Sequence, residues 1–163
     1  VEVLTADLVE EGSMEIIKDG YGHFYLPAFN FNNIPGWFVE QGYQIKMRSA
    51  SVLTIEGVSV LSDRPIELHD GWQLIAYYPR LSVDARLALS GIVEHLIIAK
   101  DGFGNFFIPA WNFCNMGDMR MGQGYYLNID TEEPIDLVYV TEEEEGLALL
   151  PHHTSSTEDV PVV

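Results

Sequence analysis

The chain has 163 residues, of which 47% are apolar and 20% are charged, a composition typical of a globular protein and not of a disordered one. Its 25 acidic residues outnumber its 8 basic residues and give a net charge of −17, which excludes attraction to a nucleic-acid backbone or an anionic membrane surface. The sequence holds no apolar run of about 18 residues, so it predicts no membrane insertion. A single cysteine excludes an internal disulfide framework.

An internal repeat is the strongest pattern in the chain. A short helix is predicted in residues 1–13, before the first copy of the repeat. Residues 18–43 (KDGYGHFYLPAFNFNNIPGWFVEQGY) and residues 100–125 (KDGFGNFFIPAWNFCNMGDMRMGQGY) align without a gap at an offset of 82 and are identical at 13 of 26 positions. This period is longer than the roughly 20–50 residues of common solenoids. The sequence therefore predicts two pseudo-symmetric units, in residues 1–57 and 58–140.

The second unit displays the full set of predicted elements. Residues 71–79 predict a strand, and an apolar stripe with i, i+3, i+4 spacing over residues 85–96 predicts an amphipathic helix. Further strands are predicted at 96–100, 105–108, 124–129 and 134–140, with a turn at 101–104 and a loop at 112–122. The predicted fold class is α+β, with two β-rich repeats, a mostly antiparallel sheet and one short helix per repeat.

The Asp-Gly-x-Gly turns recur in both units. Asp-Gly supplies the backbone that tight hairpins need, so a positive φ is expected at Gly20 or Gly22 and at Gly102 or Gly104. A phosphate loop or a calcium loop is the alternative. No Walker lysine-serine pair follows either turn, and the acidic spacing of an EF-hand is missing, so plain hairpin turns are favoured.

The first unit has no counterpart of residues 71–79 before its helix. Either the chain was cut there, or another segment supplies that strand. One candidate follows four glutamates at 142–145, because Gly146, Leu147, Leu149 and Leu150 repeat the apolar pattern of residues 71–75. Residues 141–163 therefore form either an acidic linker and solvated tail, or a connector and an assembly strand that completes the first unit in the same chain or in a neighbour.

Three ordered motifs suggest a family. GWQLIAYYP at 71–79, IIAKDGFGNFFIPAWN at 97–112 and MGQGYYLNI at 121–129 together resemble a tandem module of large secreted, multidomain bacterial proteins, in which modules usually open with Gly-Trp-Asn-Leu-Ile and close with Gly-Gln-Gly-Tyr. The resemblance covers most of residues 14–140, and the chain departs from it at Gln73 and in its incomplete first unit. It implies an extracellular or cell-surface location and a non-catalytic role.

Aromatic and asparagine side chains are the candidate binding residues. Neighbours in a strand face opposite sides, so one ring of each aromatic pair at 24–25 and 106–107 must meet a second layer, a partner or solvent. Exposed rings can stack on sugars, and asparagine amides can bind sugar hydroxyls or satisfy loop backbone groups. The candidates are Trp37, Trp111, Tyr25, Phe107, Asn30 and Asn112.

Catalytic and metal patterns do not stand out. The five histidines have no ligand spacing, Cys114 is replaced by asparagine in the other unit, and no G-x-S-x-G motif occurs. We therefore expect no enzyme activity, no cofactor and no metal. The predicted function is attachment to a protein partner or self-association, with strand complementation as the candidate mode of attachment. The alternative is binding of a polysaccharide.

Overall fold

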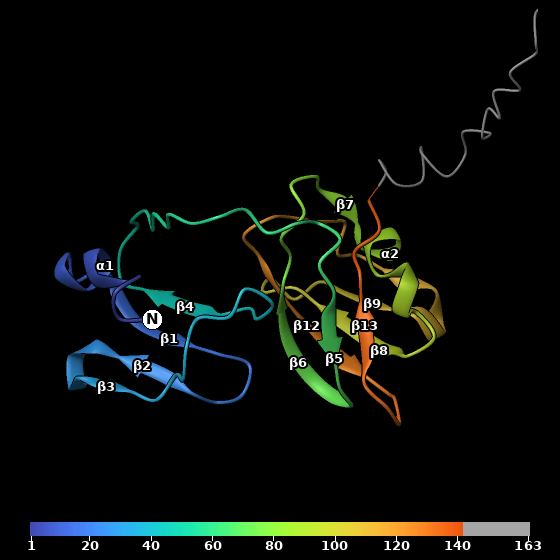
Figure 1. Cartoon of the computed structure of the whole chain (residues 1–163), viewed down its shortest axis with the longest axis horizontal. Helices are drawn as coiled ribbons and strands as arrows, with labels where there is room; N and C mark the ends of the chain where they lie inside the picture. Colours follow the sequence, from blue (N-terminus) through green and yellow to red (C-terminus); the bar gives the residue numbers. More distant parts are fainter. Residues whose placement is uncertain (142–163) are drawn as a thin grey trace, which may run out of the picture.

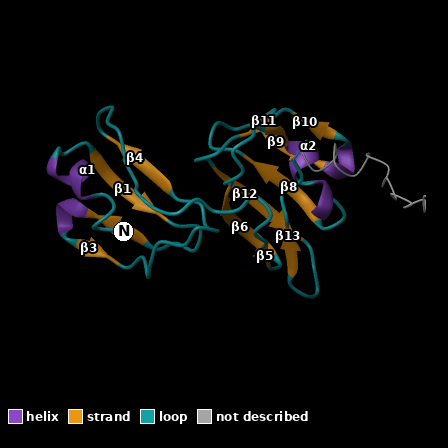
Figure 2. Ribbon diagram, turned by 45° about the horizontal axis from the view of Figure 1, so that its top comes forward, coloured by secondary structure: helices purple, strands orange, loops and turns teal. Residues whose placement is uncertain are grey.

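The computed structural model describes residues 1–141, which form a β-rich chain with antiparallel sheets and two short α-helices (Figures 1 and 2). This confirms the mostly antiparallel, β-rich character predicted from the sequence. The helices are α1 (Ala6–Glu10) and α2 (Ala85–Ala88), and 3₁₀ turns cover Pro27–Phe29, Ser90–Ile92 and Pro109–Trp111. The strands are β1 (Met14–Lys18), β2 (Phe24–Leu26), β3 (Phe31–Asn32), β4 (Gln44–Met47), β5 (Ile66–Leu68), β6 (Gly71–Ala76), β7 (Val83–Asp84), β8 (Leu96–Lys100), β9 (Phe106–Ile108), β10 (Phe113–Cys114), β11 (Asp118–Met119), β12 (Gly124–Ile129) and β13 (Ile135–Leu137).

Two sheets organise the described chain. The first has the order β3-β2-β1-β4, and the second has the order β10-β9-β8-β12-β6. Strands β1, β2 and β3 begin and end 82 residues before β8, β9 and β10, and β4 matches part of β12 at the same offset. The second sheet has one more strand, because β6 pairs with β12 along its whole length. Two short pairs, β11-β7 and β13-β5, complete the second half.

Each sheet has its own apolar core. The first is small and consists of Leu8, Met14, Ile17, Tyr25 and Ile34. The second is much larger, and it includes Ile66 and Leu68 from β5 and Leu137 from β13 as a layer next to β12. No helix within residues 1–141 has the length and apolar character needed to cross a membrane.

The predicted helix over residues 85–96 is shorter than expected. Asp84 caps α2 by accepting a hydrogen bond from the Arg86 backbone N–H at 2.9 Å, but α2 ends at Ala88. A 3₁₀ turn that contains Gly91 follows, in agreement with the low helix propensity of glycine. Leu96 belongs to β8, so the boundary between helix and strand lies before it.

The hairpin turns place their positive φ at the second glycine of each motif. Gly22 has φ 90° and Gly104 has φ 93°, whereas Gly20 and Gly102 do not adopt a positive φ. In each turn, the aspartate before the first glycine stabilises the backbone through its side chain. Asp101 accepts hydrogen bonds from the Phe103 and Asn105 backbone N–H groups.

The Gly104→Ala variant is therefore expected to lose about 1–2 kcal/mol of unfolding free energy, since an L side chain is strained at positive φ. Gly102→Ala is the matched control, because a Cβ built at Gly102 meets nothing within 4 Å and its φ is ordinary. Chemical denaturation measures both. Equal stability of the two variants would contradict this assignment of the turn.

Candidate functional site

Strand β6 is held from both sides. On one side it pairs with β12 from Gly124↔Ala76 to Ile129↔Gly71. On the other side it meets residues 40–42 of the first half, where the Gly42 N–H donates to the Leu74 carbonyl and the Ala76 N–H donates to the Glu40 carbonyl, both at 3.0 Å. The two halves of the chain are thus joined through one edge of β6.

Two glycines allow this close approach. A Cβ placed on Gly20 would lie 2.7 Å from the Leu74 Cβ, and one placed on Gly42 would lie 2.8 Å from the Ile75 carbonyl oxygen. Real Cβ atoms do not come so near to other atoms, so both positions require glycine. The turn at 19–22 and the Gln41-Gly42 motif therefore pack closely against one side of β6.

A cleft lies beside β4, and it is lined by residues 82 positions away from those that flank β6. The counterpart of β12 is β4, which within residues 1–141 pairs with β1 alone and forms the edge of its sheet. The counterparts of residues 40–42 and of Gly20 are residues 122–124 and Gly102. The cleft has a volume of about 270 Å³ and is lined by Tyr43, Gln44, Ile45, Leu74, Gly102, Phe103, Gln123, Gly124 and Tyr126.

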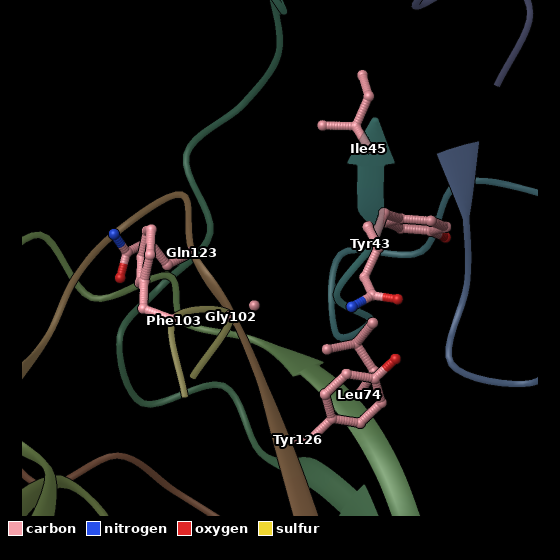
Figure 3. Close-up of a pocket in the computed structure, with 9 residues that line it drawn as sticks. Tyr43, Ile45, Leu74, Gly102, Phe103, Gln123 and Tyr126 are labelled. Carbon is pink, nitrogen blue, oxygen red and sulfur yellow. The ribbon is translucent and has the colours of Figure 1, made fainter. Parts of the chain in front are cut away.

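Figure 3 shows the two sides of this cleft. Tyr43 and Ile45 project from β4 and the residues that lead into it, while Phe103 and Gln123 stand opposite them on the second half of the chain. Gly102 lies open, and the ring of Phe103 is 81% exposed. The space between β4 and the 102–103 turn is therefore accessible to an extended segment.

The first sheet also lacks the cover that protects the second. Ile45 of β4 is 41% exposed, whereas its counterpart Leu127 in β12 is fully buried. Leu53 and Ile55 are exposed, whereas Leu137, the counterpart of Ile55, is fully buried in β13. Apolar residues 82 positions apart thus differ in exposure: those of β12 and β13 are buried, whereas their counterparts in the first half meet solvent.

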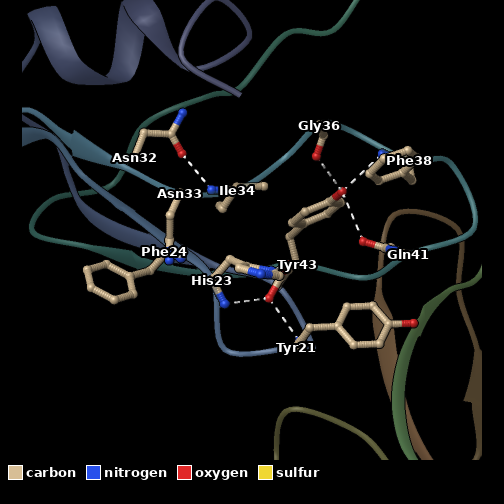
Figure 4. A network of polar contacts seen from close by, with 11 residues as sticks. Tyr21, His23, Phe24, Asn32, Asn33, Ile34, Gly36, Phe38, Gln41 and Tyr43 are labelled. Carbon is tan, nitrogen blue, oxygen red and sulfur yellow. Dashed lines mark hydrogen bonds and ion pairs between the residues drawn. The ribbon is translucent and has the colours of Figure 1, made fainter.

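Tyrosine hydroxyls fix the loops beside the cleft. The Tyr43 hydroxyl accepts a hydrogen bond from the Phe38 N–H at 3.0 Å and donates to the Gly36 carbonyl at 3.1 Å (Figure 4). Tyr125 accepts from the Arg120 N–H at 2.9 Å in the same way. Burial raises the pKa of both tyrosines despite these backbone hydrogen bonds, so both stay neutral and hold the loops near neutral pH.

The candidate binding residues occupy varied places. Tyr25 and Phe107 are 8% and 4% exposed and belong to the two cores, so their rings are not available for stacking on a ligand. Trp37 stacks on Tyr43 at a centroid distance of 4.1 Å. Trp111, in contrast, is 74% exposed.

Two pairs of loop asparagines lie at equivalent positions of the two halves. Asn30 and Asn112 both have φ 49° and end the 3₁₀ turns in the left-handed conformation that asparagine tolerates. Their neighbours Asn33 and Asn115 accept hydrogen bonds from the Phe24 and Phe106 N–H groups at 2.7 Å. The side chains of Asn33 and Asn115 thus fix their loops, whereas those of Asn30 and Asn112 are exposed and stay candidates for ligand binding.

Sequence reasoning did not identify Gly102, Phe103 or Gln123 as site residues. These residues belong to the recurring Gln-Gly-Tyr and Asp-Gly motifs, which the sequence does reveal. Their position at the cleft, however, depends on how the two halves of the chain pack together. The proposed assembly strand Gly146, Leu147, Leu149 and Leu150 lies outside the described residues. Within residues 1–141, no group of three or more His, Cys, Asp or Glu side chains is placed to hold a metal ion.

The chain was also compared with known proteins. No family model matches the sequence, and neither the curated proteins nor the solved structures yield a significant match. The functional interpretation therefore depends on the geometry of the cleft and on the internal repeat.

Proposed function

We propose that this protein is a non-catalytic module for protein–protein attachment or assembly, and that it acts by accepting a β-strand at the free edge of β4. We further propose that residues 1–57 and 58–140 are two pseudo-symmetric copies of one unit. An extracellular or cell-surface location is part of this proposal and follows from the resemblance to modules of large secreted bacterial proteins.

One observation carries the proposal. Strand β12 is flanked by β8 and β6, whereas β4, its counterpart, is flanked only by β1 among the described strands. A free strand edge presents unpaired N–H and C=O groups and is a template for strand addition. The exposed Ile45 on this edge adds an apolar contact that an incoming strand would bury.

The polar contacts support a structural role over a catalytic one. Asp19 and Asp101 each accept hydrogen bonds from two backbone N–H groups of their own turn. The tyrosine and asparagine contacts described above also fix backbone groups. These side chains are occupied in building the repeat.

The chain carries one strand candidate of its own, residues 146–150, and a neighbouring copy could supply it. A heterologous contact of this kind need not close, and it would build a head-to-tail chain of molecules. Deletion of residues 146–163 is then expected to reduce the mass of assemblies, measured by size-exclusion chromatography with light scattering. Loss of stability in a monomer would instead indicate insertion within the same chain.

The deletion variant also has an outcome that rejects residues 146–150 as the strand. That outcome is a variant with the stability and the mass of the full chain. A variant that replaces the four glutamates at 142–145 with glutamine is the matched control, since it lowers the charge but keeps the apolar segment. Weaker charge repulsion would raise the mass of its assemblies or leave it unchanged, so a fall in mass on deletion reports loss of the apolar segment.

Polysaccharide binding is the second candidate function. It is favoured by Phe29 and Trp111, which are 77% and 74% exposed at matching positions of the two 3₁₀ turns. Aromatic rings of this kind offer flat apolar surfaces. Retardation of the protein in a native gel that contains polysaccharide, lost in a Trp111→Ala variant, would support this function.

A further inference from the structure

The contacts of β6 describe what a strand in the cleft would touch. Gly42 and Gly124 are counterparts at the offset of 82, and they also touch each other, since a Cβ built on Gly124 would lie 3.4 Å from the Gly42 Cα. Contact between equivalent positions is the mark of an isologous, two-fold interface. Such an interface has two equivalent strand positions. One is filled by β6, and the other is the cleft beside β4 (Figure 3).

A second open surface lies next to the cleft. In the second half, β5 immediately precedes β6 and pairs with β13, with Ile135 opposite Leu68 and Leu137 opposite Ile66. The counterpart of β13 is residues 53–55, which form no strand within the described chain. Leu53 and Ile55 are 37% and 46% exposed there. The first half therefore presents pairing positions for two strands.

The register of β6 also identifies a polar contact. Lys100 holds its ammonium group 4.3 Å from the centre of the Trp72 ring, a cation–π arrangement. Lys18 is the counterpart of Lys100, and it is exposed. An incoming strand with an aromatic residue at the place of Trp72 would meet the Lys18 ammonium group.

We propose that the occupant of this surface is a segment of two consecutive short strands supplied by a partner polypeptide, with the pattern Ile-x-Leu-x-x-Gly-Trp-x-Leu-Ile found at residues 66–75, where β5 pairs with β13 and β6 pairs with β12. This inference builds on the strand addition at β4 proposed above. The second strand of this two-strand segment lies in the cleft, with its leucine against Gly102 as Leu74 lies against Gly20. The first strand pairs with residues 53–55.

Two observations argue against residues 141–150, and against residues 66–76 of a second copy, as the source of both strands. Residues 146–150 match the second strand of the two-strand segment, but residues 141–143, at the place of the first strand, are Thr-Glu-Glu and lack the two apolar side chains. Residues 66–76 of a second copy are already used, because Ile66 and Leu68 are 3% and 0% exposed in their own core.

The test uses the full-length protein and a fluorescently labelled synthetic peptide of residues 66–76, with binding followed by fluorescence anisotropy. We expect saturable binding. Gly102→Ala is expected to weaken it by at least about tenfold, since a Cβ at this position would meet the leucine of the peptide as it would at Gly20. The control is Gly91→Ala, which also meets nothing within 4 Å but lies outside the cleft. Thermal unfolding of both variants shows that they are folded.

Two shorter peptides test whether the occupant needs both strands. A peptide of residues 71–76 retains the strand for the cleft but loses the strand for residues 53–55, so it is expected to bind at least about tenfold more weakly. A peptide of residues 146–151 is expected to bind as weakly. If either short peptide binds as tightly as the 66–76 peptide, the two-stranded occupant is wrong, while strand addition at β4 stands.

The remaining outcomes separate the two proposals. Binding of the 66–76 peptide that Gly102→Ala leaves unchanged would overturn the placement of the leucine against Gly102. Failure of all three peptides to bind, together with no effect of deleting residues 146–163, would reject strand addition at β4 and the two-strand occupant with it.

Discussion

The Leu127→Ala variant is expected to lose about 2–5 kcal/mol of unfolding free energy, the usual cost of a buried leucine-to-alanine change. Leu127 of β12 is fully buried and belongs to the large core, which also includes residues of β5 and β13. Ile45 is its counterpart and is 41% exposed, so Ile45→Ala is expected to cost less than about 1 kcal/mol. Chemical denaturation of both variants measures this difference between the two sheets.

One outcome of the comparison between Ile45→Ala and Leu127→Ala would contradict the proposed acceptor surface. If Ile45→Ala were as destabilising as Leu127→Ala, the face of β4 would already be covered in the free protein. The proposed acceptor surface would then not exist. Val58→Ala, a change at a residue that is 97% exposed, sets the baseline for an apolar residue with no packing to lose.

Asp19 and Asp101 carry the second large effect. Burial alone would raise the pKa of Asp19, but the hydrogen bonds from His23 and from the Tyr21 backbone outweigh it and hold the pKa below its usual value. The pKa of Asp101 is lowered in the same way, against burial, by hydrogen bonds from Asn105 and from the Phe103 backbone. Removing either carboxylate leaves backbone N–H groups without their acceptor. Asp19→Ala and Asp101→Ala are each expected to cost about 1–3 kcal/mol near neutral pH.

The pH dependence follows from the direction of the pKa shift. A carboxylate with a lowered pKa in the folded state contributes stability above its unfolded pKa of about 4, and this contribution is lost as the pH falls through the folded value. The gap in stability between the wild type and each alanine variant is therefore expected to narrow as the pH falls below about 4. The control is Glu10→Ala on the exposed face of α1, which should cost little at neutral pH. A gap that stays constant in urea titrations across this pH range would contradict the role of the two carboxylates.

Local signals predicted the hairpins of the fold. The Asp-Gly turn at 101–104, with apolar strands before and after it, gave β8 and β9 within a residue of their observed bounds. The two-residue strands β7 and β11 and the three-residue β5 were not predicted. Strands this short show no alternation, and their pairing depends on packing against the large core.

The candidate site was only partly predictable. Comparison of the two units predicted that residues 1–57 contain no counterpart of the strand at residues 71–79. The walls formed by Gly102 and residues 122–124 could not be predicted in this way, because they depend on how the two halves meet at β6. The burial of Tyr25 and Phe107 could not be predicted either. Alternation along a strand shows that neighbouring side chains face opposite sides of the sheet, but it does not show which side faces the core.

Residue-resolved amide hydrogen exchange at β4 tests strand addition most directly. In the free protein, the amides on the open edge of β4, with Ile45 at its centre, are expected to exchange faster than those of Leu127 and its neighbours, which β6 covers. Addition of the 66–76 peptide is expected to slow exchange at Ile45 and its neighbours and to leave Leu127 unchanged. If the peptide binds while exchange along β4 stays as fast as in the free protein, this edge does not accept a strand.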